Sequence, residues 1–159
     1  MDEAVIRYYR QLLKDDFPHA GEIECPTIFV EAVGEKLIHC GNTGNYMQLY
    51  FRVADSRIAD LRYLCSCEPA ANVAVEVLCT LARGKTLPEA AALEEEAFYQ
   101  VVGSREEEFA KKVRGILALF SEGIAGCQGS DGGPGPGGTG GKDGRVVADG
   151  FTWDRSYSP

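Results

Sequence analysis

The residues of this sequence that are best suited to chemistry are thiols. Cys65 and Cys67 stand one residue apart, at the end of a strand-like run and just before an apolar helical run that begins near Pro69. Side chains at positions i and i+2 of an extended chain point to the same side, so these two sulfurs are expected to lie together. The partial positive charge at the N-terminus of the following helix favours the thiolate, which is the form that binds metals.

A second segment rich in possible ligands lies earlier in the chain. Cys40 opens the sequence CGNTGN, whose glycines and asparagines tolerate the positive φ angles of a sharp bend. If this loop lies beside the strand that carries Cys65 and Cys67, three thiolates come together. Asn45 and Glu68 are then supporting oxygen donors. Thiolates suit iron, zinc and iron–sulfur clusters. The alternative is that Cys65 and Cys67 only pack at the edge of the core, since cysteine also behaves as a small hydrophobic residue.

The other residues whose side chains could take part in chemistry are not expected to belong to this site. Cys79 lies in the middle of an apolar helical run and is expected in the core. His19 lies in the first loop, where the sequence shows no partner for it. We find no Ser–His–Asp set, no phosphate-binding loop and no paired carboxylates in an acid–base setting. The sequence therefore predicts a protein that is not an enzyme.

The composition and the net charge of the chain argue against two kinds of binding partner, nucleic acids and anionic membranes. A formal net charge of −8 argues against sequence-independent binding to nucleic acid or to an anionic membrane, because both require a basic surface. No segment approaches the roughly 20 apolar residues that span a bilayer, and the N-terminal residues lack the apolar run of a signal peptide. The expected location is the cytoplasm, where the 6 cysteines would be reduced.

The pattern of apolar residues predicts an α+β fold. The expected elements are a helix over residues 3–14, strands over 27–33, 46–53 and 57–64, a helix over 69–83, and later helices that begin after Thr86 and Ser104. Alternation from Met47 to Val53 places one face of the second strand in the core, and Thr86 with Glu89 forms a possible capping box. Short connections between the strands indicate an antiparallel three-stranded meander sheet with helices packed on one face. Residues 1–126 are expected to form one domain. Residues 127–159, rich in glycine and proline, are expected to be a disordered C-terminal tail.

The run from Tyr46 to Ala90 resembles the central block of the NifU/IscU-type iron–sulfur cluster assembly scaffolds, and the resemblance covers about residues 1–124. That family has a Gly–Asp–x–Met–x–Leu strand and a second strand rich in isoleucine, aspartate and an aromatic residue. A cysteine at a helix start and a Gly–Lys–Thr/Ser–Leu–x–Glu–Ala turn follow. The matching residues here are Gly44, Asn45, Met47, Leu49, Val53, Ile58, Asp60, Arg62, Tyr63, Gly84, Lys85, Thr86, Leu87, Glu89 and Ala90.

This sequence departs from the family at the ligands. Members normally offer three cysteines and one aspartate around the cluster. Asparagine replaces the aspartate here, whether the matching loop is Cys40-Gly41-Asn42 or Thr43-Gly44-Asn45. An ungapped count back from Gly84 places the second cysteine position at Glu68, next to Cys67. The third position falls near Glu106, where no cysteine stands.

The resemblance implies a scaffold-like protein that binds iron or a labile iron–sulfur cluster through Cys40, Cys65 and Cys67. In such a protein the Cys65/Cys67 pair accepts persulfide sulfur from a cysteine desulfurase, Cys40 helps to hold iron, and the cluster passes to acceptor proteins. Two alternatives remain open at this point. One is a metal-free interaction module of the same fold that binds an assembly partner, and the other is a zinc-stabilised variant.

Overall fold

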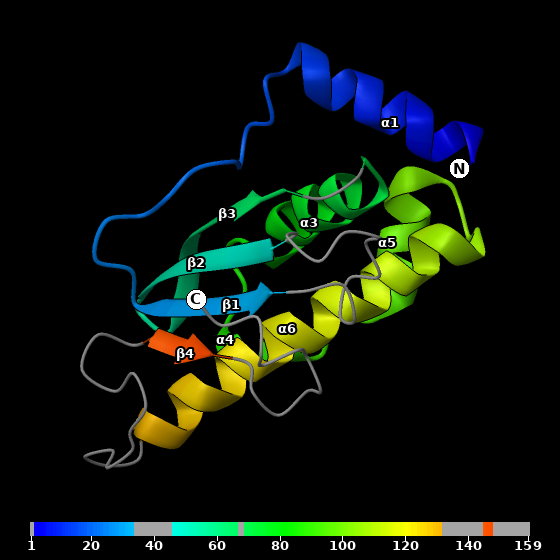
Figure 1. Cartoon of the computed structure of the whole chain (residues 1–159). Coiled ribbons are helices and arrows are strands. Elements are labelled where there is room, and N and C mark those ends of the chain that lie inside the picture. Colours follow the sequence, from blue (N-terminus) through cyan, green and yellow to red (C-terminus); the bar gives the residue numbers. More distant parts are fainter. Residues whose placement is uncertain (1, 34–45, 67–68, 132–144, 148–159) are drawn as a thin grey trace.

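The computed structural model describes residues 2–33, 46–66, 69–131 and 145–147. Its centre is a mixed sheet in the order β3-β2-β1-β4 (Figure 1). The strands are β1 (Ile28–Val33), β2 (Tyr46–Ala54), β3 (Arg57–Cys65) and β4 (Arg145–Val147). β1, β2 and β3 pair antiparallel, as the sequence predicts, and β4 adds a short parallel pairing to β1.

Two of the helices, α3 (Pro69–Ala82) and α6 (Glu107–Asp131), lie against one face of this sheet, and the other helices pack on them (Figure 1). The others are α1 (Glu3–Lys14), α4 (Leu87–Ala91) and α5 (Glu95–Val102). α3 packs against β3 and α6 against β1, while α1 lies on α3. The predicted cap at Thr86 is confirmed: its side chain accepts a hydrogen bond from Glu89 N, and the Glu89 side chain accepts one from Thr86 N. The α+β prediction is thus confirmed.

Alternation along the strands separates a helix-facing side from an outer side. The helix-facing side chains are all at most 2% exposed, and they are Ile28, Val30, Ala32, Met47, Leu49, Phe51, Ile58, Leu61 and Tyr63. The β2–β3 hairpin turns at Asp55 and Ser56, whose φ angles are both positive, 54° and 64°. Two positive φ angles match the twist of the flanking strands, which explains the tight connection here.

Close approach of α6 to the sheet depends on a small residue. A Cβ atom added to Gly123 would lie 3.3 Å from Val30 Cγ1 and 3.5 Å from Phe51 Cζ. The helix backbone therefore sits directly on the core side chains of β1 and β2, which brings its apolar stripe into the core.

Two described elements, α6 and β4, lie partly or wholly beyond residue 126. α6 continues to Asp131, beyond the expected boundary at residue 126, and β4 lies within the segment expected to be disordered. β4 contains Val146 and Val147, a β-branched pair in an otherwise glycine-rich stretch. Hydrogen bonding to the edge of β1, together with the strand propensity of the two valines, explains why so short a segment forms a strand there.

Candidate functional site

Cys65 is the last residue of β3 and is half-buried against the core. It pairs with Met47 on β2, and its Sγ donates a hydrogen bond to Asn72 Oδ1 at 3.1 Å. Asn72 lies in the first part of α3. The thiol predicted from the sequence is therefore placed between the end of a strand and the start of a helix, as expected.

Two chain connections begin and end at this same end of the sheet. Val33, the last residue of β1, pairs with Tyr46, the first residue of β2. Tyr46 N donates to Ser66 Oγ at 3.2 Å, and Ser66 N donates to the Tyr46 carbonyl oxygen at 3.2 Å. Tyr46, which follows segment 34–45, thus contacts Ser66, which follows Cys65.

The other predicted ligands belong to these two connections. Cys40 and Asn45 lie in segment 34–45, and Cys67 and Glu68 form the link between Ser66 and α3; all four lie outside the described residues. Within the ranges that the structure describes, no group of three or more His, Cys, Asp or Glu residues is arranged to hold a metal ion. Cys65 is the one predicted ligand whose position is given, and the ligand set itself stays a prediction.

A buried polar network holds the chain next to Cys65. Glu76 on α3 is only 2% exposed. Its Oε1 lies 2.8 Å from His19 Nδ1, and its Oε2 accepts hydrogen bonds from His19 N at 3.2 Å and from Tyr63 Oη at 2.9 Å. Buried charges are stable in proteins when they are paired and hydrogen-bonded in this way. Burial, reinforced by the charge on Glu76, raises the pKa of Tyr63, so that its hydroxyl remains a donor.

This network was missed at the level of sequence. His19 seemed to have no partner, and the acid that it meets lies 57 positions away. A signal was present in α3, where Asn72 and Glu76 interrupt the apolar run PAANVAVEVLC with helical i, i+4 spacing. The two polar side chains contact Cys65 and Tyr63, which are two residues apart on β3. Together they fix α3 against the end of β3 where the predicted site begins.

The other two thiols among the described residues, Cys79 and Cys25, differ from Cys65 in their exposure to solvent. Cys79 is fully buried, as expected, and burial, followed by the nearby charge of Glu76, raises the pKa of its thiol well above the ordinary value. A thiol in that state is a poor ligand and a poor nucleophile. Cys25 is exposed, in the segment that precedes β1.

Glu106 lies at the position expected for the third cysteine of the NifU/IscU-type scaffolds, and it joins two helices by a hydrogen bond. Its Oε1 accepts a hydrogen bond from Asp2 N at 2.8 Å, which ties the start of α6 to the start of α1. The Glu106 N–H in turn donates to Ser104 Oγ at 3.1 Å. The carboxylate at this position thus has a structural role in joining the two helices.

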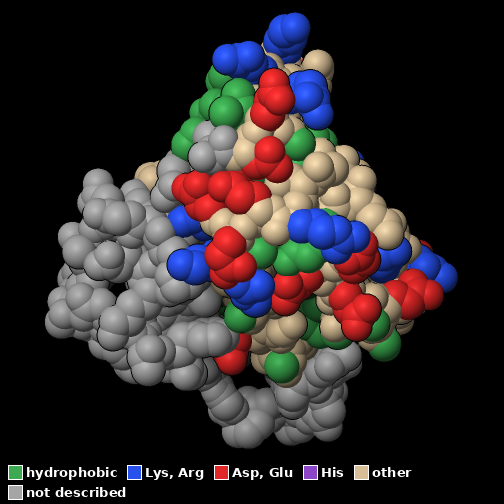
Figure 2. Space-filling view, turned by 90° about the vertical axis from the view of Figure 1, so that its right-hand side faces the viewer, with side chains coloured by type: hydrophobic (Ala, Val, Ile, Leu, Met, Phe, Trp, Pro, Cys, Tyr) green, Lys and Arg blue, Asp and Glu red, His purple; other side chains and the backbone are tan. Residues whose placement is uncertain are grey.

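The surface shows charges of both signs. Figure 2, which looks onto the side where α5 and the N-terminus lie in Figure 1, shows acidic and basic side chains intermixed rather than gathered by sign. Exposed ion pairs on α5 and α6, such as Arg114 with Glu107 at 2.8 Å, agree with this mixture. Among the described helices, none has the length and apolar character needed to cross a membrane.

Comparison with known proteins finds similarity at the level of the fold. No protein-family model matches the sequence, and no curated protein matches it. A solved structure described as a scaffold protein for iron–sulfur cluster assembly in the SUF system of Fervidobacterium islandicum AW-1 is similar with a TM-score of 0.54. The sequences are 18% identical, and the match covers 76% of this chain and 93% of that one. A NifU-like N-terminal domain from Brucella abortus matches with a TM-score of 0.46, at 14% identity, over 76% of this chain and 80% of that one. The match to the SUF-system structure confirms, at the level of the fold, the resemblance to NifU/IscU-type scaffolds that the sequence shows.

Proposed function

We propose that this protein binds iron, or a labile iron–sulfur cluster, at the end of the sheet where the β1–β2 and β3–α3 connections meet, and that it acts in cluster assembly. The ligands in this proposal are Cys40, Cys65 and Cys67. Asn45 and Glu68 support them as oxygen donors. The observation that carries the proposal is the pair of hydrogen bonds between Tyr46 and Ser66, because it joins the two connections that contain these residues.

The described surroundings of Cys65 suit a thiolate that must remain accessible. Its side chain is half-buried rather than sealed, unlike that of Cys79. The N-terminus of α3 lies just beyond it, and the partial positive charge of a helix start favours an anion there. Asn72 accepts the thiol hydrogen at 3.1 Å and has an amide group that can donate to a thiolate after deprotonation.

The similarity to a SUF-system scaffold supports a role as carrier rather than as enzyme. In the proposed reaction the thiolate of Cys65 or Cys67 attacks the outer sulfur of a persulfide on a cysteine desulfurase. A new sulfur–sulfur bond forms, the desulfurase S–S bond breaks, and the desulfurase thiolate leaves with the electron pair. The transfer needs no external oxidant. Conversion of the outer sulfur of the bound persulfide to the sulfide of a cluster takes two electrons, which an added reductant of the dithiol class supplies. Iron and sulfide are cargo, and acceptor proteins receive the assembled cluster. The proposed location is the cytoplasm.

The absence of the aspartate should weaken retention of the metal rather than its binding by sulfur. Asn45 is neutral and supplies an oxygen without a negative charge, so iron held by three thiolates has one anionic partner fewer. We therefore expect less than a full complement of iron per chain after loading. The measurement is iron and sulfide content of the isolated protein after removal of unbound metal.

Anaerobic loading with iron and sulfide tests the proposal. The full chain should develop visible absorption from sulfur-to-iron charge transfer, and Cys65→Ser should abolish it, because serine keeps the size of the side chain but is a poor ligand for these metals. Cys25→Ser is the matched control: its thiol is exposed and lies in the segment before β1, so loading should be unchanged.

Three results would contradict the proposal in different ways. A colourless wild-type protein would favour a metal-free interaction module of the same fold. Stoichiometric zinc in protein purified without added metal, retained after exposure to iron and sulfide, would favour a zinc-stabilised fold. Equal loading of wild type and Cys65→Ser would place the ligands elsewhere.

A further inference from the structure

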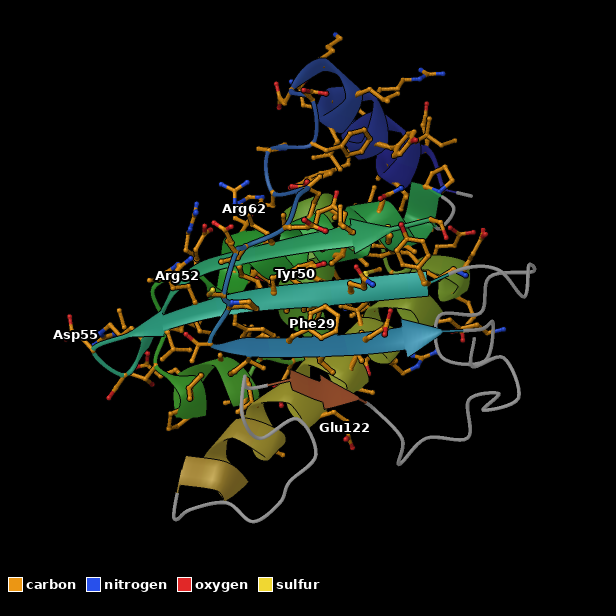
Figure 3. The ribbon with its side chains drawn as sticks, turned by 60° about the vertical axis from the view of Figure 1, so that its left-hand side comes forward. Phe29, Tyr50, Arg52, Asp55, Arg62 and Glu122 are labelled. Carbon is orange, nitrogen blue, oxygen red and sulfur yellow. The ribbon has the colours of Figure 1, made fainter. Side chains whose placement is uncertain are left out.

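The face of the sheet turned away from α3 and α6, called the outer face below, carries a small apolar cluster. Its members are Phe29 on β1, Tyr50 on β2, Ile23 from the preceding segment and Leu64 on β3. Figure 3 looks onto this face, with Phe29 and Tyr50 in front of the helices. The rings of Phe29 and Tyr50 are cross-strand neighbours, with centroids 5.1 Å apart in an edge-to-face arrangement.

These side chains are more buried than their position on an outer face would suggest. Phe29 is 9% exposed, Tyr50 is 8% exposed and Ile23 is 7% exposed. Neighbouring strands flank such a ring at about 4.8 Å but do not cover its upper surface. Among the described residues, the apolar groups that pack with the two rings are Ile23 and the half-buried Leu64. Burial of both rings calls for further cover near β1.

β4 brings the end of the chain to this place. It runs parallel to β1, with Arg145 opposite Phe29 and Val147 opposite Glu31. The chain therefore continues at residue 148 from a position opposite Glu31, two residues along β1 from Phe29. Residues 148–159 contain Phe151, Trp153 and Tyr157. A chain spans about 3.3–3.6 Å per residue, so four or five residues suffice to cross the roughly 14 Å from β4 to β3.

Charge on the two surfaces is complementary. Arg52 on β2 and Arg62 on β3 lie at the outer face beside the aromatic cluster (Figure 3). Arg52 is exposed and donates a hydrogen bond to the carbonyl oxygen of Glu24 at 3.2 Å. That acceptor carries no charge and does not neutralise the guanidinium. Segment 148–159 contains two acids, Asp149 and Asp154, and one base, Arg155. An aromatic segment with a small excess of acid thus begins next to an aromatic surface that carries the exposed Arg52 and the Arg62–Asp60 ion pair at 3.2 Å.

We propose that residues 148–159 dock in cis on the outer face, with aromatic side chains over Phe29 and Tyr50 and acidic side chains toward Arg52 and Arg62. The docking covers the apolar cluster, and β4 covers the edge of β1. Exposed strand edges and apolar sheet faces promote association between chains, so this segment protects the sheet from self-association. The proposal does not depend on the function assigned to the thiols.

The chain contains 1 tryptophan, Trp153, which reports on the docking directly. In the full-length protein its fluorescence should be blue-shifted, and acrylamide should quench it several-fold less than in the urea-unfolded chain. Phe29→Ala should shift the emission to the red and raise the quenching. Tyr99→Ala is the matched control, because it also removes one ring of an edge-to-face pair, with Phe109 on the helical side, and it should leave Trp153 protected.

A second variant keeps the test valid if Phe29→Ala fails to fold. Arg52→Glu reverses an exposed charge and should also raise the quenching of Trp153, whereas Arg114→Glu, on α6, should not. Quenching in the wild type equal to that of the unfolded chain would overturn the proposal. Protection that survives both Phe29→Ala and Arg52→Glu would overturn it as well. Protection lost on dilution would assign the outer face to a second copy of the chain, and protection gained only with an added protein would assign it to a partner.

Discussion

Replacing Glu76 with alanine is expected to lower the free energy of unfolding by about 3–5 kcal/mol, because each buried donor left without an acceptor costs about 1–3 kcal/mol. Glu76 is 2% exposed and accepts hydrogen bonds from the His19 backbone and the Tyr63 hydroxyl. Alanine would leave both donors and the His19 ring without their acceptor inside the protein. Chemical denaturation of the wild type and the variant measures the difference.

Glu76→Gln is the matched control for this prediction. Glutamine has nearly the same shape and keeps one oxygen that can accept from Tyr63 or from His19, so its loss should be clearly smaller than that of alanine. Hydrogen exchange adds a local readout, because the amide of His19 donates to Glu76 and the amide of Tyr63 donates to the His19 carbonyl oxygen at 3.2 Å. Both amides should exchange faster in Glu76→Ala. Unchanged exchange together with an unfolding midpoint equal to that of the wild type would show that the network does not hold this segment.

Replacing Phe51 with alanine should cost about 3–5 kcal/mol of stability, as truncation of a buried aromatic side chain generally does. Phe51 is completely buried, and its ring stacks on that of Phe120 with centroids 5.2 Å apart and planes 11° from parallel. This contact joins β2 to α6 through the middle of the core. The cavity left by alanine can close only in part, because the backbone at Gly123 already lies against the same ring.

Two variants on the same strand control for effects other than packing. Phe51→Leu fills part of the space and should lose less stability than Phe51→Ala. Arg52→Ala changes the next residue, which is exposed on the outer face, and should lie within about 0.5 kcal/mol of the wild type if its role is confined to the surface. A loss for Phe51→Ala no larger than that for Arg52→Ala would contradict the core described here.

Local patterns were sufficient to predict the three antiparallel strands and the helices between them. Alternation from Met47 to Val53 identified the core side of β2, and the Thr86–Glu89 pair identified a capping box that the structure contains. Such features depend on neighbours along the chain. The sequence also placed Cys65 at the end of a strand before a helix, because the strand pattern and the helical pattern meet there.

Contacts distant in sequence escaped prediction. The pairing of His19 with Glu76 depends on how α3 packs against the segment after α1, and no periodicity within either segment reveals it. β4 depends on the unpaired edge of β1, which becomes available only when the sheet has formed. The same limit applies to the candidate site. Patterns identify the thiols, but bringing Cys40 to Cys65 requires the path of two connections that join at Tyr46 and Ser66.

Bifunctional thiol cross-linking tests most directly whether Cys40 and Cys65 lie together. In the metal-free full chain carrying Cys25→Ser, Cys67→Ser and Cys127→Ser, dibromobimane should link the peptide that contains Cys40 to the peptide that contains Cys65 within one chain. Cys79 is completely buried and should not react. Monobromobimane, which modifies one thiol at a time, is the control for accessibility. Labelling of both residues by the monofunctional reagent with no linked peptide from the bifunctional one would contradict the proposed site.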